Sequence, residues 1–230
     1  MDNAERLTRL GIEAAERVQD GMLVGLGTGT TAKAMIDALG DRVKSGLACN
    51  GVATSKYTSD LATSLGIPMR KLYDIDRLDL CIDGADEIDP ALDLVKGRGG
   101  ALLFEKLVAR RADRYLIIAT DEKLVLRLGT RMPLPVEVIP VGWTHTAESI
   151  MELHLRPALR TQDDGSPFIT DGGHYIVDCA WPENAEVDPG SLAGALKALT
   201  GVVDHGLFIG MATEALTIDL SGEVTEHGRK

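Results

Sequence analysis

The sequence of 230 residues lacks a long apolar run, a cysteine framework and an apolar leader segment. No hydrophobic stretch approaches the length needed to cross a bilayer, so no membrane insertion is expected. Its first residues carry charges and have no apolar block of the kind that marks a secretory signal, which favours a cytoplasmic protein. Cys49, Cys81 and Cys179 have no paired spacing, and buried free thiols are therefore expected.

Signals for metal and nucleic-acid binding are also missing. The five histidines never share a helical face with an acidic ligand at a metal-binding spacing, so no protein-bound metal is expected. The net charge of −11 opposes nucleic-acid binding, which requires a concentrated basic surface. An anionic small molecule would have to be bound by local backbone amides and a few lysines.

What the first half contains is an alternation of short apolar runs and helical segments. This pattern is typical of an α/β, Rossmann-like fold, with a mostly parallel sheet and helices on both faces. Strands are expected at Met22–Leu26, Val52–Thr54, Leu78–Ile82 and Tyr115–Ala119, and helices at about 32–39 and 56–65. In open sheets of this kind, ligands bind at the loops that follow the carboxyl ends of the strands.

The sequence changes character from Gly129. The segment RMPLPVEVIP is rich in proline, which cannot continue a helix. Beyond it we expect a smaller α+β, ferredoxin-like lobe, with a helix near 147–155, two strands around the Asp171-Gly172-Gly173 turn and a helix near 191–199. The run 205–220 is expected to supply two closing strands, one of them returning to the first domain.

We therefore predict two domains. Residues 1–128 and 205–230 would form the Rossmann-like catalytic domain, and residues 129–204 the small lobe, which would serve oligomerisation. No internal repeat or low-complexity tract interrupts this organisation.

A glycine-rich turn, Gly25-Leu-Gly27-Thr28-Gly29-Thr30-Thr31, lies between an expected strand and a helix. Glycines let the backbone approach an anion, while amides at the helix start and threonine hydroxyls can donate to phosphate. Thr30 occupies the place of the third glycine of a dinucleotide fingerprint and the P-loop lysine is absent, which disfavours an NAD-dependent enzyme. A purely structural turn remains an open interpretation.

The acidic segment Asp83-Gly84-Ala85-Asp86-Glu87 follows the strand LDLCI directly. Three carboxylates at a strand end repel one another unless a ligand, a lysine or a function compensates for the repulsion. A solvated acidic turn that continues into Asp89-Pro90 is the alternative.

The segment Lys96-Gly97-Arg98-Gly99-Gly100 leads into an apolar helix that carries Glu105. Helical spacing puts Glu105 on the apolar face, toward the sheet, and Lys106 and Arg110 on a separate polar stripe. A carboxylate among apolar neighbours beside a glycine loop is a candidate general base, because desolvation favours proton uptake. The alternative is a surface glutamate that pairs with Arg110.

Lys123 lies in Asp121-Glu122-Lys123, which follows the expected strand Tyr115–Ala119. At that position its charge could reach a phosphate group. An ordinary exposed lysine is the alternative.

Taken together, these segments resemble the type A family of ribose-5-phosphate isomerases over nearly the whole chain. The segments GLGTGTT, DLCIDGADEID, VKGRGGALLFEKLVA, DEKLV and LPVEVIP occur in that family's order and spacing, and TDGGHYIVDC and GLF also fit. The resemblance implies interconversion of D-ribose 5-phosphate and D-ribulose 5-phosphate through a cis-enediolate, in the pentose phosphate pathway. It also implies an enzyme without metal or organic cofactor that works as a homodimer or homotetramer.

The resemblance further implies roles for individual residues. Glu105 would move the proton, Lys96 would stabilise the oxyanion, and Asp83 and Asp86 would contact the sugar hydroxyls and assist ring opening. The other implied substrate contacts are Thr28, Gly29, Thr30, Thr31, Gly84, Ala85, Gly97, Arg98, Gly99 and Lys123.

The sequence departs from the family's pattern in a few places. Thr30 replaces a common serine, Phe104 a common basic residue and Arg98 a frequent glycine. A lysine that often approaches the phosphate from the first helix is absent, and Arg6 and Arg9 lie there instead, which leaves this contact open.

A non-catalytic sugar-phosphate sensor is the competing interpretation. The acidic charge and the short segment of about twenty residues before the first strand, too few for a helix-turn-helix, argue against it.

Overall fold

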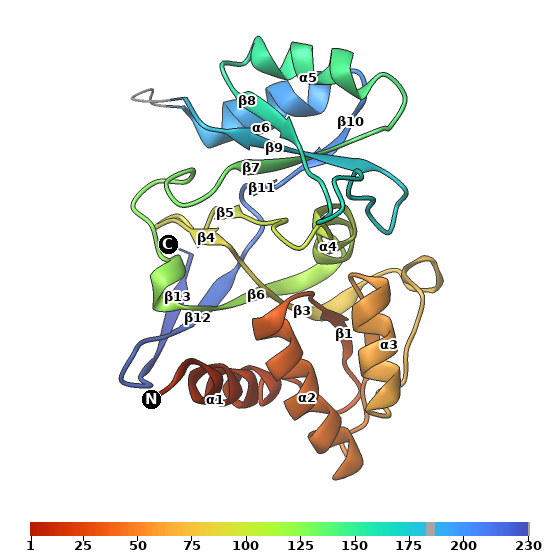
Figure 1. Cartoon of the computed structure of the whole chain (residues 1–230). Helices are drawn as coiled ribbons and strands as arrows, with labels where there is room; N and C mark the ends of the chain where they lie inside the picture. Colours follow the sequence, from red (N-terminus) through yellow and green to blue (C-terminus); the bar gives the residue numbers. More distant parts are fainter. Residues whose placement is uncertain (183–186, 230) are drawn as a thin grey trace.

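The computed structural model describes residues 1–182 and 187–229, and it contains one large sheet and two smaller ones (Figure 1). The large sheet has the strand order β13-β12-β6-β3-β1-β2. Its strands are β1 Leu23–Leu26, β2 Asn50–Ala53, β3 Leu78–Gly84, β6 Ala112–Thr120, β12 Glu214–Ile218 and β13 Val224–Gly228. All neighbours pair in parallel except β13, which runs antiparallel to β12. The prediction of an α/β fold with a mostly parallel sheet is confirmed.

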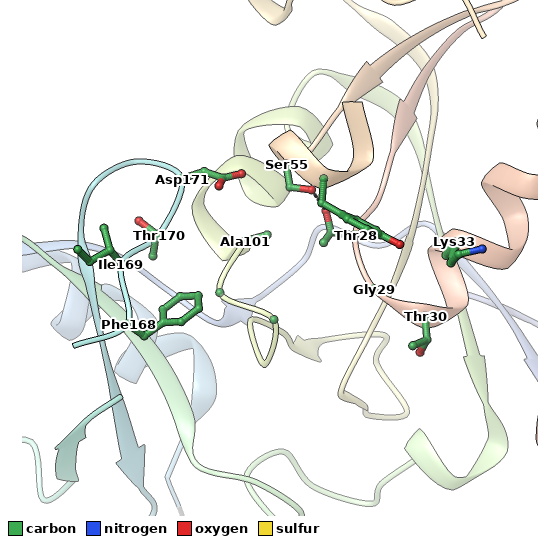
Figure 2. Close-up of a pocket in the computed structure, with 13 residues that line it drawn as sticks. Thr28, Gly29, Thr30, Lys33, Ser55, Ala101, Phe168, Ile169, Thr170 and Asp171 are labelled. Carbon is green, nitrogen blue, oxygen red and sulfur yellow. Dashed lines mark hydrogen bonds between the residues drawn. The ribbon is translucent and has the colours of Figure 1, made fainter. Parts of the chain in front are cut away.

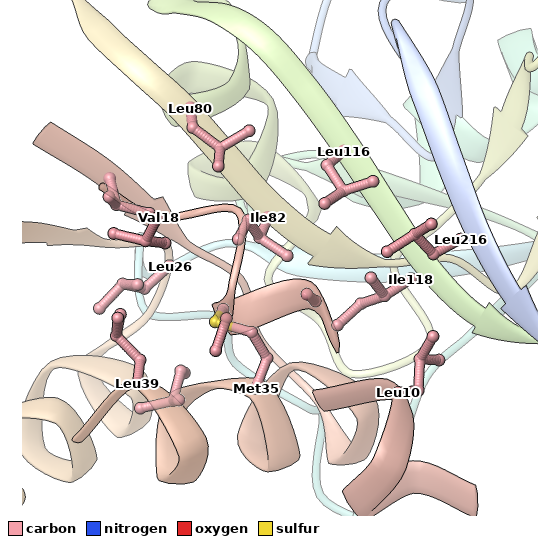
Figure 3. Packing of buried hydrophobic residues seen from close by; sticks show 14 of the residues in the cluster. Leu10, Val18, Leu26, Met35, Leu39, Leu80, Ile82, Leu116, Ile118 and Leu216 are labelled. Carbon is pink, nitrogen blue, oxygen red and sulfur yellow. The ribbon is translucent and has the colours of Figure 1, made fainter. Parts of the chain in front are cut away.

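Helices cover one face of this sheet. They are α1 Asn3–Ala15, α2 Thr30–Lys44 and α3 Lys56–Ser64. Because side chains alternate along a strand, Leu80, Ile82 and Leu116 point to this face, where Leu10 of α1 and Met35 of α2 pack against them (Figure 3). The other face packs against α4 Leu102–Ala109 and a three-stranded sheet of β4 Glu87–Ile88, β5 Leu94–Val95 and β11 Leu207–Phe208.

The second lobe is an antiparallel sheet of order β10-β7-β9-β8 with two helices. Its elements are β7 Leu134–Val138, α5 Trp143–Met151, β8 Arg156–Leu159, β9 Tyr175–Ala180, α6 Pro189–Ala198 and β10 Val202–His205. This order is the βαββαβ unit expected for a ferredoxin-like lobe. Figure 1 places this lobe beyond α4, on the side of the molecule away from α1 and α2.

Several expected elements differ in detail. The helix predicted near 147–155 begins earlier, at Trp143, and ends at Met151, and His154 beyond it has a positive φ of 63° that no helix continues. Only one of the two strands predicted around the Asp171 turn forms, because the segment before the turn makes just an isolated bridge from Ile169 to Tyr175. The strand that pairs with β9 is instead β8, earlier in the chain.

The closing run behaves as predicted, since β11 joins the small three-stranded sheet and β12 returns to the large sheet beside β6. The three cysteines are buried and free, as expected. Within residues 1–182 and 187–229, no helix has both the length and the apolar character needed to span a membrane.

Candidate active site

Glu105, Lys96 and Asp83 meet in a buried cluster between the large sheet and α4. The Nζ atom of Lys96 lies 3.1 Å from Oδ2 of Asp83 and 3.3 Å from Oε2 of Glu105. Lys96 also donates a hydrogen bond to the carbonyl oxygen of Gly84 at the end of β3. The three side chains are at most 6% exposed. Their ionisation is therefore governed by their burial and by one another's charges.

Burial and the charge of Asp83 raise the pKa of Glu105, Lys96 opposes the rise, and the net result is a pKa of about 8. The pKa of Asp83 is also raised by burial and lowered by Lys96. For Lys96, burial lowers the pKa, but the charges of Asp83 and Glu105 outweigh it and leave the pKa above its ordinary value. The cluster thus combines Lys96, which stays positively charged, with the carboxyl group of Glu105, which can gain and lose a proton near neutral pH.

Asp83 is held by the glycine turn. Its Oδ1 atom accepts hydrogen bonds from the backbone amides of Thr28, at 3.1 Å, and Gly84, at 2.7 Å. A Cβ atom on Gly27 would lie 2.1 Å from that same oxygen, so only glycine allows Asp83 to approach this closely. The glycine turn and the acidic segment are therefore one structural unit.

The side chain of Thr28 belongs to a network of hydroxyl groups. Its Oγ1 atom lies 2.8 Å from those of Thr54 and Ser55 and 3.1 Å from that of Thr58. Ser55 also caps α3 by accepting a hydrogen bond from the amide of Thr58. The network fixes the end of β1 against the start of α3.

A cavity of about 380 Å³ opens beside the turn (Figure 2). Thr28, Gly29 and Thr30 line one side of it, and the Gly99–Ala101 segment and residues 168–171 line the other. The buried cluster does not line this cavity itself. Two residues that line the cavity connect it to the cluster. The amide of Thr28 donates a hydrogen bond to Asp83, and the carbonyl oxygen of Ala101 accepts a hydrogen bond of 3.0 Å from the amide of Glu105.

Sequence reasoning missed part of this lining. The missed residues are Lys33, Ser55, Tyr57, Ala101, Phe168, Ile169, Thr170 and Asp171. The sequence predicts Asp171 only as part of a turn between two strands. Its place in the site depends on how the small lobe lies against the large sheet, which no local pattern encodes. The Oδ2 atom of Asp171 accepts the amide of Lys56 at the start of α3, at 2.7 Å.

The acidic segment is not a solvated turn. Glu87 is fully buried and accepts the amides of Gly129 and Arg131, each at 2.6 Å, and that of Met132 at 3.2 Å. It thereby binds the segment that leads into the small lobe. Asp86 is half-buried, and its Oδ2 atom accepts the amide of Arg98 at 3.1 Å.

The prediction that Lys106 and Arg110 share a polar stripe on the helix is wrong for Lys106. Arg110 is exposed, but Lys106 is buried because β10 packs against that side of α4. Its Nζ atom lies 2.6 Å from Oδ1 of Asp204 and 2.6 Å from the carbonyl oxygen of His205. Burial lowers the pKa of Lys106 to about 8, against the charge of Asp204. Pairing of Glu105 with Arg110 is also wrong, since the partner of Glu105 is Lys96.

The remaining predicted contacts are spread around the same strand ends. Three of them are half-buried: Thr31 in the first turn of α2, Gly84 at the end of β3 and Ala85 directly after it. Lys123 is half-buried in the 3₁₀ turn Asp121–Lys123 after β6, outside the cavity lining.

The first helix reaches this same turn through Arg6. Arg6 is buried, and its guanidinium group lies 2.8 Å from Glu122 and 3.7 Å from Asp121. That ion pairing holds α1 against the turn after β6. Across the described residues, no group of three or more His, Cys, Asp or Glu side chains is arranged to hold a metal ion.

Comparisons with known proteins agree with this geometry. The family model described as ribose 5-phosphate isomerase A (phosphoriboisomerase A) matches residues 50–222. A ribose-5-phosphate isomerase A of Thermomicrobium roseum is 52% identical over 86% of this chain and 84% of its own length.

Solved structures are similar over the whole chain. Ribose 5-phosphate isomerase A of Methanocaldococcus jannaschii covers 99% of this chain and 100% of its own, with 33% identity and a TM-score of 0.92. A D-ribose-5-phosphate isomerase in complex with phospho-erythronic acid covers 100% of both chains, with 35% identity and a TM-score of 0.94. The chain therefore belongs to the ribose 5-phosphate isomerase A family.

Proposed function

We propose that the protein interconverts D-ribose 5-phosphate and D-ribulose 5-phosphate, with Glu105 as the base that moves a proton between C2 and C1. The observation that carries this proposal is the buried Glu105 carboxylate, 3.3 Å from the ammonium group of Lys96 and one turn beyond residues that line the cavity. Family membership supports the isomerase activity, and the bound phospho-erythronic acid of one relative supports a phosphorylated sugar as ligand.

The chemistry needs one base and one centre of positive charge. Removal of the C2 proton produces a cis-enediolate, and return of the same proton to C1 completes the isomerisation, so a single carboxylate serves both steps. Lys96 and a backbone amide of the loop 97–100 that has no partner within the protein would stabilise the charge that develops on the enediolate oxygen, a contribution that is often the largest in such reactions. Asp83 and Asp86 would contact the sugar hydroxyls and assist ring opening.

The phosphate group would bind at the start of α2. Gly29, the N-cap residue, has a φ of 112° and provides no side-chain cap, so the amides of Thr30 and Thr31 stay available for an anion. Lys33 lines the same cavity, and Lys123 would contribute charge from the end of β6. Binding the substrate by its far end lends binding energy to the chemical step.

The direct test is Glu105→Gln, which keeps the shape of the side chain and removes its basicity. We expect turnover of ribose 5-phosphate, followed by ketose absorbance, to fall by about 10³-fold while the fold and phosphate binding persist. The exposed Glu16 provides a matched control, and Glu16→Gln is expected to leave turnover unchanged. Near-normal turnover by Glu105→Gln would remove Glu105 from the mechanism.

A sugar-phosphate sensor without catalytic activity would bind ribose 5-phosphate and form no ketose. The same assay on the wild-type protein therefore separates the two functions.

We also propose a cytoplasmic homodimer or homotetramer in which the small lobe, residues 129–204, supplies the contact between subunits. Large apolar side chains are exposed on this lobe at Val141, Met151 and Ile139, with exposed fractions of 83%, 57% and 40%. These side chains are the ones that contact with a second subunit would cover. Sedimentation analysis distinguishes monomer, dimer and tetramer.

A further inference from the structure

The small lobe reaches the glycine loop of the site through Arg160, the residue that follows β8. Its Nη1 atom donates hydrogen bonds to the carbonyl oxygens of Gly97, at 3.1 Å, and Arg98, at 3.0 Å. The same guanidinium group donates to both carboxylate oxygens of Asp178 on β9, at 2.8 and 2.5 Å. A bidentate pair of this kind fixes the plane of the guanidinium group.

These two hydrogen bonds determine where the amides of the loop point. A trans peptide unit is planar, so its N–H lies opposite its carbonyl group. With the carbonyl of Gly97 directed at Arg160, the amide of Arg98 must point away from Arg160, and it does, donating to Asp86 at 3.1 Å. With the carbonyl of Arg98 also directed at Arg160, the amide of Gly99 faces away from Arg160 as well.

The amide of Gly99 is the group that this arrangement leaves available. Gly99 lines the cavity, and no hydrogen bond from its amide is found within the described part of the chain. One further hydrogen bond closes the loop, from the amide of Gly100 to the carbonyl of Gly97 at 3.0 Å, and Gly97 and Gly100 adopt the positive φ values of 106° and 81° of this turn. Because glycine leaves the backbone free to rotate, the orientation of the loop depends on such hydrogen bonds.

Arg160 also holds the neighbouring wall of the cavity. Its carbonyl oxygen accepts the amide of Phe168 at 2.9 Å, and its guanidinium carbon lies 5.7 Å from the centre of the Phe168 ring. That ring packs on Gly100, where a Cβ atom would lie 2.4 Å from it. Figure 2 shows Phe168 on the opposite side of the cavity from Thr28 and Thr30.

We propose that Arg160 is a positioning residue for the isomerisation: by binding the carbonyls of Gly97 and Arg98 it directs the amide of Gly99 toward the enediolate oxygen. The inference rests on the proposed function, in which this loop stabilises the oxyanion. The small lobe then contributes to catalysis in addition to any role in assembly.

The test compares Arg160→Met with Arg127→Met, an exposed arginine after β6 that lies outside the cavity lining. For both variants we would measure steady-state kinetics with ribose 5-phosphate and the dissociation constant of phospho-erythronic acid. The carboxylate of this ligand resembles the enediolate. For Arg160→Met we expect kcat to fall by about 10- to 100-fold, KM to change less than about threefold, and affinity for phospho-erythronic acid to fall with kcat. Arg127→Met should match the wild type.

A purely structural role would instead lower the folded fraction, leaving kcat per folded molecule and the affinity for phospho-erythronic acid unchanged. That result, or a change confined to KM, would overturn the inference. Should Arg160→Met fail to fold, Asp178→Asn retains the guanidinium group but loosens its orientation, and the same kcat-specific loss of smaller size is expected. If the wild-type protein forms no ketose, the proposed function itself is wrong. If the wild-type protein forms ketose and Asp178→Asn has the same kcat, only the role of Arg160 is wrong.

Discussion

Raising the pH from 5 to 9 is expected to destabilise the folded protein through Glu105. Burial raises the pKa of this carboxyl group from 4.5 to about 8. In the unfolded chain the group loses its proton near pH 4.5, whereas the folded protein retains it up to about pH 8. Since the folded state binds more protons over this interval, the free energy of unfolding falls as the pH rises through it.

The size of the effect follows from the difference between the two pKa values. At about 1.4 kcal/mol for each pH unit, the part of this interval that lies above pH 5, up to a pKa of about 8, corresponds to roughly 4 kcal/mol as an upper limit. A glutamine at this position does not titrate. The stability of Glu105→Gln relative to the wild type is therefore expected to increase from pH 5 to pH 9, by as much as that limit.

The assay is urea denaturation of both proteins at pH 5, 7 and 9. Groups outside the cluster of Glu105, Lys96 and Asp83 also titrate over this range, but they are common to both proteins and largely cancel in the difference between them. A difference in the free energy of unfolding that stays constant across the three pH values would refute the raised pKa of Glu105. The same pKa predicts that kcat/KM of the wild type rises with pH through an ionisation near 8, because the base must be deprotonated to act.

Two further substitutions test the scaffold of the site. Gly27→Ala would bring a Cβ atom to 2.1 Å from Oδ1 of Asp83. We expect this substitution to displace Asp83, to lower turnover and to reduce the free energy of unfolding in denaturant titrations by about 1–3 kcal/mol. Wild-type turnover and stability would contradict this steric conflict. Glu87→Gln removes the charge that accepts three backbone amides, and a loss of about 2–3 kcal/mol is expected in the same titrations, whereas an unchanged midpoint would contradict the anchoring role.

The parts of the site that the sequence predicts are those encoded by local patterns. Gly27 and the acidic segment lie at the ends of neighbouring parallel strands, which brings them together in any sheet of this type. The helical spacing of Glu105 predicts its burial in the same way. These arguments need only the periodicity of one element and the edge at which its strand ends.

The parts that could not be predicted depend on contacts between elements far apart in the chain. Lys106 is buried only because β10, about a hundred residues later, covers that side of α4. The wall formed by Phe168 and Asp171, and the hydrogen bonds of Arg160, depend on the docking of the small lobe against α4. No pattern within a single segment encodes such contacts.

The central claim is that Glu105 carries a proton between two carbons, and isomerisation in heavy water tests it most directly. A carboxyl group that exchanges its proton with solvent should place deuterium on C1 of the ribulose 5-phosphate formed by the wild type, and Glu105→Gln should form neither the ketose nor the deuterated sugar. Ketose formation or deuterium incorporation that persists in Glu105→Gln at the wild-type rate would contradict the account.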